Sequence, residues 1–195
     1  MNGNKERTKK AILDAFNERI AREDFSRISV AEICRGANVS AATFYRYFSD
    51  KYDVMNENYR RILFACASRP DVHGYRDLYY QLYSFAQGSL WRSIRYSFRS
   101  EGVNSLRRFV AQYSYAFAEA ITRQNRGGKG YTEVESMQCR VFCDGIGQMY
   151  EDWTFGRYHI PPDEAADALC AIMPPTLRNY WLVRSLRPED VQMSG

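Results

Sequence analysis

The chain has 195 residues, of which 45% are apolar and 26% charged, and its 27 basic and 23 acidic residues give a formal net charge of +4. This is the composition of an ordinary globular protein, and it excludes a disordered, low-complexity or collagen-like chain. The longest apolar runs, such as Ile62–Ala67, are far shorter than the roughly 18 residues that suggest a membrane span, so no membrane segment is expected.

Residues 1–7 are mostly polar and no apolar signal-peptide segment follows them, which argues against secretion and predicts a cytoplasmic location. The five cysteines are an odd number, and we expect free, mostly buried thiols in a reducing compartment. Cys139 and Cys143 stand four residues apart, but the two histidines, His73 and His159, lack the spacing of zinc ligands. We therefore expect neither a cofactor nor a metal site.

The positive charge is concentrated near the amino terminus. Residues 1–69 carry 13 Lys and Arg against 9 Asp and Glu, whereas residues 70–195 carry 14 of each sign. A local basic excess suits a nucleic-acid backbone, although a solvated protein surface often carries as much charge.

The first 70 residues contain patterns for four helices. Apolar residues recur every four positions in residues 5–22, as an amphipathic helix requires. Ser29 and Glu32 form a capping-box pattern that predicts a short helix to about Ala37, and Ser40 caps a third helix through Phe48. A fourth helix is expected over residues 51–68.

Helical patterns continue beyond Pro70, over residues 75–100 with a bend near Gly88, and over 104–124, 132–155 and 162–184. Proline removes a backbone donor and clashes with the preceding turn, so Pro174 and Pro175 should bend or split the last helix. No strand alternation persists, and the predicted fold class is all-α.

The third helix is the strongest functional candidate. Phe44 and Phe48 share one stripe and should point into a three-helix core, which leaves Ala42, Tyr45 and Arg46 outside. A short helix that follows another after a tight turn is the arrangement that enters a DNA major groove. Helix-turn-helix shapes also occur in proteins that bind no DNA. In such a protein Tyr45 and Tyr47 would be plain packing residues.

Each residue type on this surface has a chemical use against DNA. Alanine methyl groups can meet thymine methyl groups, and hydroxyl groups can donate to phosphate oxygens. Arg46 can read a guanine or contact a phosphate, and Ser29 and Lys51 would contact phosphates at helix ends.

The segment ISVAEICRGANVSAATFYRYFSDK, residues 28–51, resembles the amino-terminal domain of the TetR family of bacterial transcriptional regulators. The resemblance covers roughly residues 5–60. It implies an all-α homodimer with a three-helix helix-turn-helix DNA-binding domain over residues 1–50. A larger helical ligand-binding and dimerisation domain would follow over residues 51–195, with the helix 51–68 connecting the two. The implied function is a repressor that binds a palindromic operator and is released by a small-molecule effector.

By this resemblance the DNA-contacting positions are Ser29, Ser40, Ala41, Ala42, Thr43, Tyr45, Tyr47 and Lys51, to which the surface argument adds Arg46. The sequence departs from the family at positions 41 and 42, often a longer polar residue and a glycine, and at Tyr47, where histidine is common. Direct base reading is therefore expected to depend more on Arg46, Thr43 and Tyr45.

The last two predicted long helices occupy the places where family members form a four-helix dimer interface. The expected interface residues are Val141, Gly145, Met149, Trp153, Leu169, Ile172, Met173, Thr176 and Tyr180. The alternative for any one of them is a core stripe within a single chain.

Aromatic residues crowd the middle helices, where an apolar cavity with hydroxyl groups would suit an aromatic or amphipathic ligand. The candidates are Tyr79, Tyr83, Trp91, Tyr96 and Tyr113. Packing in the core is the alternative reading of each.

No nucleophile, base and orienting acid form a recognisable set, so we predict no enzyme. Two other hypotheses stay open at this point. One is a helical small-molecule-binding protein or enzyme whose DNA-binding domain is no longer used, and the other is an architectural DNA-binding protein without ligand control.

Overall fold

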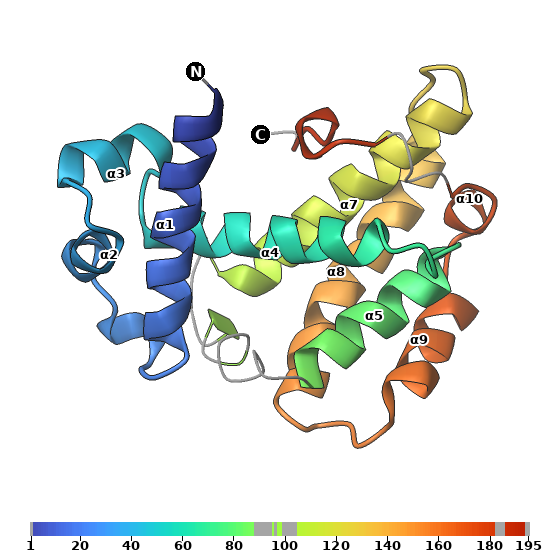
Figure 1. Cartoon of the computed structure of the whole chain (residues 1–195). Coiled ribbons are helices and arrows are strands. Elements are labelled where there is room, and N and C mark those ends of the chain that lie inside the picture. The colour runs from blue at the N-terminus through green and yellow to red at the C-terminus, as the bar shows by residue number, and fades with distance from the viewer. Residues whose placement is uncertain (1, 88–94, 96, 99–104, 182–185, 194–195) are drawn as a thin grey trace. The chain divides into compact units, whose positions relative to one another are not determined.

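The computed structural model describes residues 2–87, 95, 97–98, 105–181 and 186–193. Every regular element in these ranges is helical, which confirms the all-α prediction (Figure 1). Within these ranges, none of the helices combines the length and the apolar character of a membrane-spanning segment. The chain divides into two compact units, one holding residues 1–59 and the described part of 89–106, the other holding residues 60–88 and 107–195.

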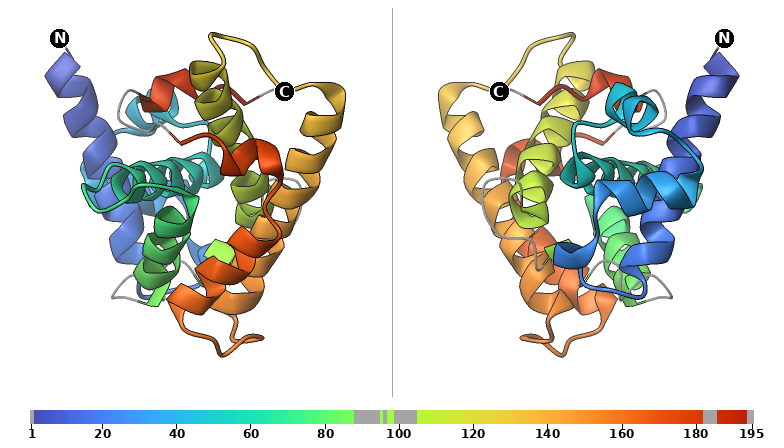
Figure 2. Two further views of the ribbon diagram at one scale, coloured as in Figure 1. Left: turned by 90° about the vertical axis from the view of Figure 1, so that its right-hand side faces the viewer. Right: turned by 90° about the vertical axis from the view of Figure 1, so that its left-hand side faces the viewer.

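Over residues 2–59, the amino-terminal unit contains three helices, a 3-10 turn and the start of a fourth helix. These are α1 (Asn2–Ile20), the turn η1 (Phe25–Arg27), α2 (Val30–Ala37), α3 (Ala41–Tyr47) and the first part of α4 (Lys51–Ala67). Helix α1 packs along α2, and α2 meets α3 (Figures 1 and 2). Apolar residues from all three helices, Ile12, Phe16, Ile20, Ile33 and Phe44, are at most 1% exposed and form the core.

The carboxy-terminal unit begins with the rest of α4. It continues with α5 (Tyr75–Gln87), α7 (Leu106–Asn125), α8 (Glu133–Thr154), α9 (Pro162–Ala171), α10 (Pro175–Arg178) and the turn η2 (Pro188–Asp190). Helix α5 lies beside α9, and α8 contacts α10. Helices α7 and α8 approach closely at Gly147, where a Cβ atom would lie 2.8 Å from the carbonyl oxygen of Arg107.

Most predicted helices are found within a few residues of their expected ends. The helix expected over 75–100 is confirmed as far as Gln87, and the part beyond it lies largely outside the described residues. The helix expected over 162–184 is split into α9 and α10, because Pro174 cannot continue α9 and Pro175 suits the first turn of a new helix. The short turn η1 was not predicted, since three residues show no periodicity.

Candidate nucleic-acid interface

Helix α2 begins with the predicted capping box. The Ser29 hydroxyl accepts from the amide of Glu32 at 3.3 Å, and the Glu32 carboxylate accepts from the Ser29 amide at 3.0 Å. Hydrogen bonds from the Ser29 hydroxyl and amide lower the pKa of Glu32. The carboxylate therefore stays charged at neutral pH and holds the first turn of α2 in a fixed position.

Glu32 also ties α2 to α1. Arg19, near the end of α1, lies 3.1 Å from a Glu32 carboxylate oxygen and 3.1 Å from Glu23. At the other end of α2, a Cβ atom at Gly36 would lie 3.1 Å from the Cβ of Ala15 in α1. The contacts at both ends fix the position of α2 on α1.

The turn between α2 and α3 is tight. Asn38 ends α2 in a left-handed conformation with φ of 52°, which asparagine tolerates better than most residues. Ser40 then caps α3 by accepting from the Thr43 amide at 3.1 Å, and its hydroxyl lies 3.0 Å from the Thr43 hydroxyl oxygen. The Thr43 hydroxyl accepts that bond, so its own proton is available to another acceptor.

Helix α3 has one buried face and one exposed face, as predicted. Phe44 is fully buried and Phe48, just after the helix, is 3% exposed, and their ring centroids lie 5.9 Å apart. On the other side Tyr45 is 59% exposed, and Ala41, Ala42 and Arg46 are also exposed. Thr43 and Tyr47 are half-buried at the flanks. The exposed face therefore carries two methyl groups, hydroxyl groups and one guanidinium.

Of the two helix-end positions, Ser29 is exposed and Lys51 is half-buried. The Lys51 ammonium donates to three backbone carbonyl oxygens, those of Phe25, Ser26 and Ile28, at 2.8, 3.2 and 2.8 Å. Burial is the main cause of a lowered pKa for this lysine. Sequence reasoning missed this role, because the acceptors lie more than twenty residues earlier in the chain.

The tyrosines predicted to bind a ligand are buried inside the carboxy-terminal unit. Tyr79, Tyr83 and Tyr113 are at most 6% exposed. Tyr83 packs edge-on against Tyr150 and Trp153, and burial raises its pKa well above the ordinary value. Tyr113 stacks on Phe109 with centroids 5.4 Å apart. Trp91 and Tyr96 lie outside the described residues.

The residues predicted for the dimer interface fall into two groups. Val141 and Ile172 are each 69% exposed, Gly145 is exposed, and Met149 and Tyr180 are half-buried. Trp153, Leu169, Met173 and Thr176, by contrast, are at most 7% exposed and pack within their own unit. The Trp153 indole donates to the carbonyl of Ile160 at 3.1 Å.

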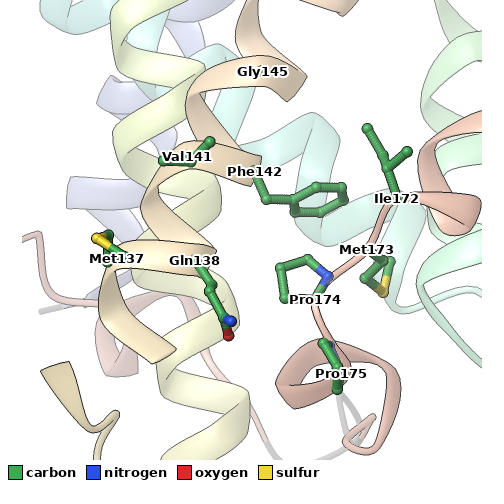
Figure 3. Close-up of a pocket in the computed structure, with 9 residues that line it drawn as sticks. All are labelled: Met137, Gln138, Val141, Phe142, Gly145, Ile172, Met173, Pro174 and Pro175. Carbon is green, nitrogen blue, oxygen red and sulfur yellow. The ribbon is translucent and has the colours of Figure 1, made fainter. Parts of the chain in front are cut away.

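Two exposed apolar residues of α8, Val134 and Met137, extend the exposed group, at 61% and 65% exposure. Val134, Met137 and Val141 are spaced by three and four residues, so they lie on the same face of α8, and this pattern is visible in the sequence. A pocket lies between this face of α8 and residues 172–175, with Phe142 pointing across it toward Ile172 (Figure 3). We call Val134, Met137, Val141 and Gly145 of α8, together with Ile172 directly after α9, the α8 apolar face.

Comparison with known proteins places the helix-turn-helix in a family. Residues 12–57 match the model of the bacterial regulatory proteins of the tetR family. An uncharacterized HTH-type transcriptional regulator from Haemophilus influenzae is 45% identical over 47 residues. That match covers 24% of this chain and 23% of the relative's length, so the likeness in sequence is confined to this region.

Two solved structures resemble a larger part of the chain. A TetR transcriptional regulator from Rhodococcus sp. RHA1 has a TM-score of 0.61 at 18% identity, over 88% of this chain and 98% of the other. The dihydroxyacetone kinase operon activator DhaS has a TM-score of 0.57 at 16% identity, over 89% of this chain and 97% of the other. At these identities the likeness establishes the fold, an amino-terminal helix-turn-helix followed by a larger helical part.

Proposed function

We propose that the chain is a DNA-binding transcriptional regulator of the TetR family whose helix α3 enters the major groove. The match of residues 12–57 to the tetR family model supports this proposal. The observation that carries this proposal is the exposed face of α3, with Tyr45 59% exposed beside Arg46 on a helix held by the fully buried Phe44. A rigid helix with small and hydrogen-bonding side chains outward is what base edges and phosphates require.

We assign the contacts by exposure and chemistry. Ala41 and Ala42 would let the first turn of α3 approach the bases, and Arg46 would read a base edge. Thr43, Tyr45 and Tyr47 carry hydroxyl groups suited to phosphates, and Ser29 and Ser40 would contribute from the beginnings of α2 and α3.

We further propose that two copies pair through the α8 apolar face. Its four apolar side chains are each more than 60% exposed, and exposed apolar residues at this density mark contact with another protein surface. Self-pairing matches the two-fold symmetry of a palindromic operator, whose half-sites lie about 34–36 Å apart. The buried residues Trp153, Leu169, Met173 and Thr176 are not part of this proposed interface.

Repression is the proposed mode of regulation, because occupying an operator is by itself sufficient to block transcription. A small-molecule effector would act by binding the DNA-incompetent conformation more tightly. The aromatic interior of the carboxy-terminal unit, with Tyr79, Tyr83 and Tyr113, is the proposed region for it. The similar structure of an operon activator makes activation the alternative that a reporter gene would reveal.

The proposal is tested by retention of genomic DNA fragments on the protein, followed by footprinting of the retained sites. A protected inverted repeat is the expected result. Broad protection without a repeat would indicate an architectural DNA-binding protein. No retention even at low salt would contradict DNA binding and favour a helical protein whose helix-turn-helix is unused.

The effector proposal has its own test, in which a set of aromatic and amphipathic compounds is added to the protein–DNA complex. At least one compound should release the DNA and raise the midpoint of thermal unfolding of the free protein. If compounds bind without changing DNA affinity, control by a ligand through this region is contradicted.

A further inference from the structure

We propose that Lys51 is a positioning residue that fixes the entry into α2, and that its ammonium does not bind a DNA phosphate. The inference rests in part on the proposed DNA-binding function, since positioning matters there through the contact surface. It follows from the three carbonyl acceptors of the ammonium group.

The hydrogen-bonding capacity of Lys51 is fully used within the unit. An ammonium has three protons and no acceptor, and three carbonyl oxygens lie within 3.2 Å of Nζ. The same nitrogen lies 4.6 Å from the centroid of the Phe25 ring, whose side chain is 2% exposed. A phosphate oxygen would have to replace one of these carbonyls, and that carbonyl would lose its charged donor.

The three carbonyls belong to the turn η1 and to the residue that follows it. The Phe25 carbonyl also accepts from the Ile28 amide at 3.3 Å, and a cation at the end of a helical turn meets the negative end of the local dipoles. The next residue after Ile28 is Ser29, the cap of α2. Lys51 is the first residue of α4, so its side chain connects the segment after α3 to the segment before α2.

The Lys51 hydrogen bonds thus join the residues on either side of the helix-turn-helix, those just before α2 and those just after α3. Helix α2 is held on α1 by Glu32 and Arg19, and the entry to α2 is held from α4 by Lys51. Without the ammonium, the chain from Phe25 to Ile28 would lose its charged donor and Ser29 its fixed position. The exposed cations that remain for phosphates and bases near α3 include Arg46.

The salt dependence of DNA binding distinguishes the two roles. Each phosphate that a cation neutralises contributes about 0.9 to the slope of log affinity against log salt. With a labelled random-sequence duplex as the probe, Lys51→Met should weaken binding several-fold and leave this slope unchanged. Its midpoint of thermal unfolding should fall by about 5 °C, because charge-assisted hydrogen bonds are lost. Lys129→Met, which removes an exposed loop lysine, is the matched control and should change neither quantity.

A slope that becomes shallower by about 0.9 in Lys51→Met would overturn the proposal, whatever happens to stability. An unchanged midpoint of unfolding would overturn it too. If wild-type protein binds no duplex at all, the proposed function fails, while the unfolding midpoint still decides whether Lys51 holds the α2 entry.

A double-mutant cycle separates positioning from general stabilisation. Ser29→Ala should weaken duplex binding a few-fold in the wild type and have no further effect in Lys51→Met, because Ser29 is already misplaced there. Additive effects of the two substitutions, or no effect of Ser29→Ala on the wild type, would contradict positioning through α2.

Amine acylation of the wild type gives a third result that needs no variant. Lys51 should react more slowly than Lys129 both without and with duplex DNA. Protection of Lys51 that appears only when DNA is added would indicate a phosphate contact and reject the proposal.

Discussion

The two exposed faces of this protein, on α3 and on α8, differ in chemistry although both helices are anchored by buried apolar residues. Tyr45 and Arg46 present a hydroxyl and a guanidinium on α3, whereas Val141 and Ile172, each 69% exposed, make the other face apolar. A polar face is well hydrated, so its exposure to water costs little free energy, and it can form hydrogen bonds with phosphates and base edges. An apolar face lowers its free energy when another surface covers it and removes it from water. This contrast is the basis for proposing DNA as the partner of α3 and a second copy of the chain as the partner of α8.

The largest expected effect concerns the anchor of α3. Phe44 is fully buried and Tyr45, its neighbour, is 59% exposed, with the two rings edge-to-face at 5.4 Å. Phe44→Ala should lower the free energy of unfolding of the amino-terminal unit by about 3–5 kcal/mol. Tyr45→Ala is the matched control and should cost about 1 kcal/mol or less while still weakening DNA binding. Denaturant unfolding followed by circular dichroism measures the free energy of unfolding of each variant. Equal losses of this free energy in the two variants would contradict an α3 that is anchored by Phe44 and exposed at Tyr45.

A charge on the α8 apolar face should break pairing and leave the fold intact. Val141→Glu would bury an unpaired carboxylate between two copies, which should weaken self-association about a hundredfold or more. Sedimentation velocity measures the self-association of each variant. Val141→Ala, which keeps the face apolar, is the control and should remain a dimer at the same concentration. A dimer unaffected by Val141→Glu would place the interface elsewhere.

A smaller effect is expected from the guanidinium on α3. Arg46→Ala should reduce the preference for one base pair of the operator about tenfold, or about 1.4 kcal/mol, which lies within the range of roughly 1–3 kcal/mol for a bidentate base contact. The side chain is exposed, so the unfolding midpoint should not change. Binding to a panel of operator variants measures the preference. An equal loss on every sequence would make Arg46 a phosphate contact.

The smallest effect is a pH dependence in the carboxy-terminal unit. Glu135 accepts two hydrogen bonds from Arg126 at 2.6 and 2.9 Å, and this contact, the largest cause, holds the pKa of Glu135 well below its ordinary value of 4.5. The folded state therefore favours the charged form, and its contribution to stability is present above pH 4.5 and is lost as the pH falls toward the folded pKa.

Glu135→Gln keeps the capping box with Thr132 and removes the charge. It should cost about 1 kcal/mol at pH 7, since the pair is only partly buried, and the difference from wild type should shrink progressively below pH 4.5. Urea unfolding at several pH values measures this difference. A constant difference down to pH 3 would show that the charge contributes nothing.

What the sequence predicted well is local in the chain. Ser29 and Glu32 are three residues apart, as are Ser40 and Thr43, so the caps of α2 and α3 can be read directly from the sequence. The inward side of α3 follows from Phe44 and Phe48 at helical spacing. The break between α9 and α10 follows from proline, whose effect on a helix does not depend on its neighbours in space.

What the sequence did not predict depends on contacts between distant residues. The acceptors of Lys51 lie more than twenty residues earlier, and nothing in the local pattern indicates them. Helix α8 is apolar on two sides, so periodicity alone does not tell that Trp153 faces its own unit and Val134 faces outward. Nothing in the local pattern distinguishes Gly147, where a Cβ atom would lie 2.8 Å from a backbone oxygen of α7, from Gly145, whose surroundings in the chain are open.

Methylation protection on a retained genomic fragment tests the central proposal most directly, because dimethyl sulfate modifies guanine N7 in the major groove and adenine N3 in the minor groove. If the exposed face of α3 enters the major groove in a symmetric pair, guanine N7 should be protected in two half-sites about one helical turn apart, and the protection should be lost in Tyr45→Ala combined with Arg46→Ala. Protection confined to adenine N3, or guanine protection that persists in the double variant, would contradict the account.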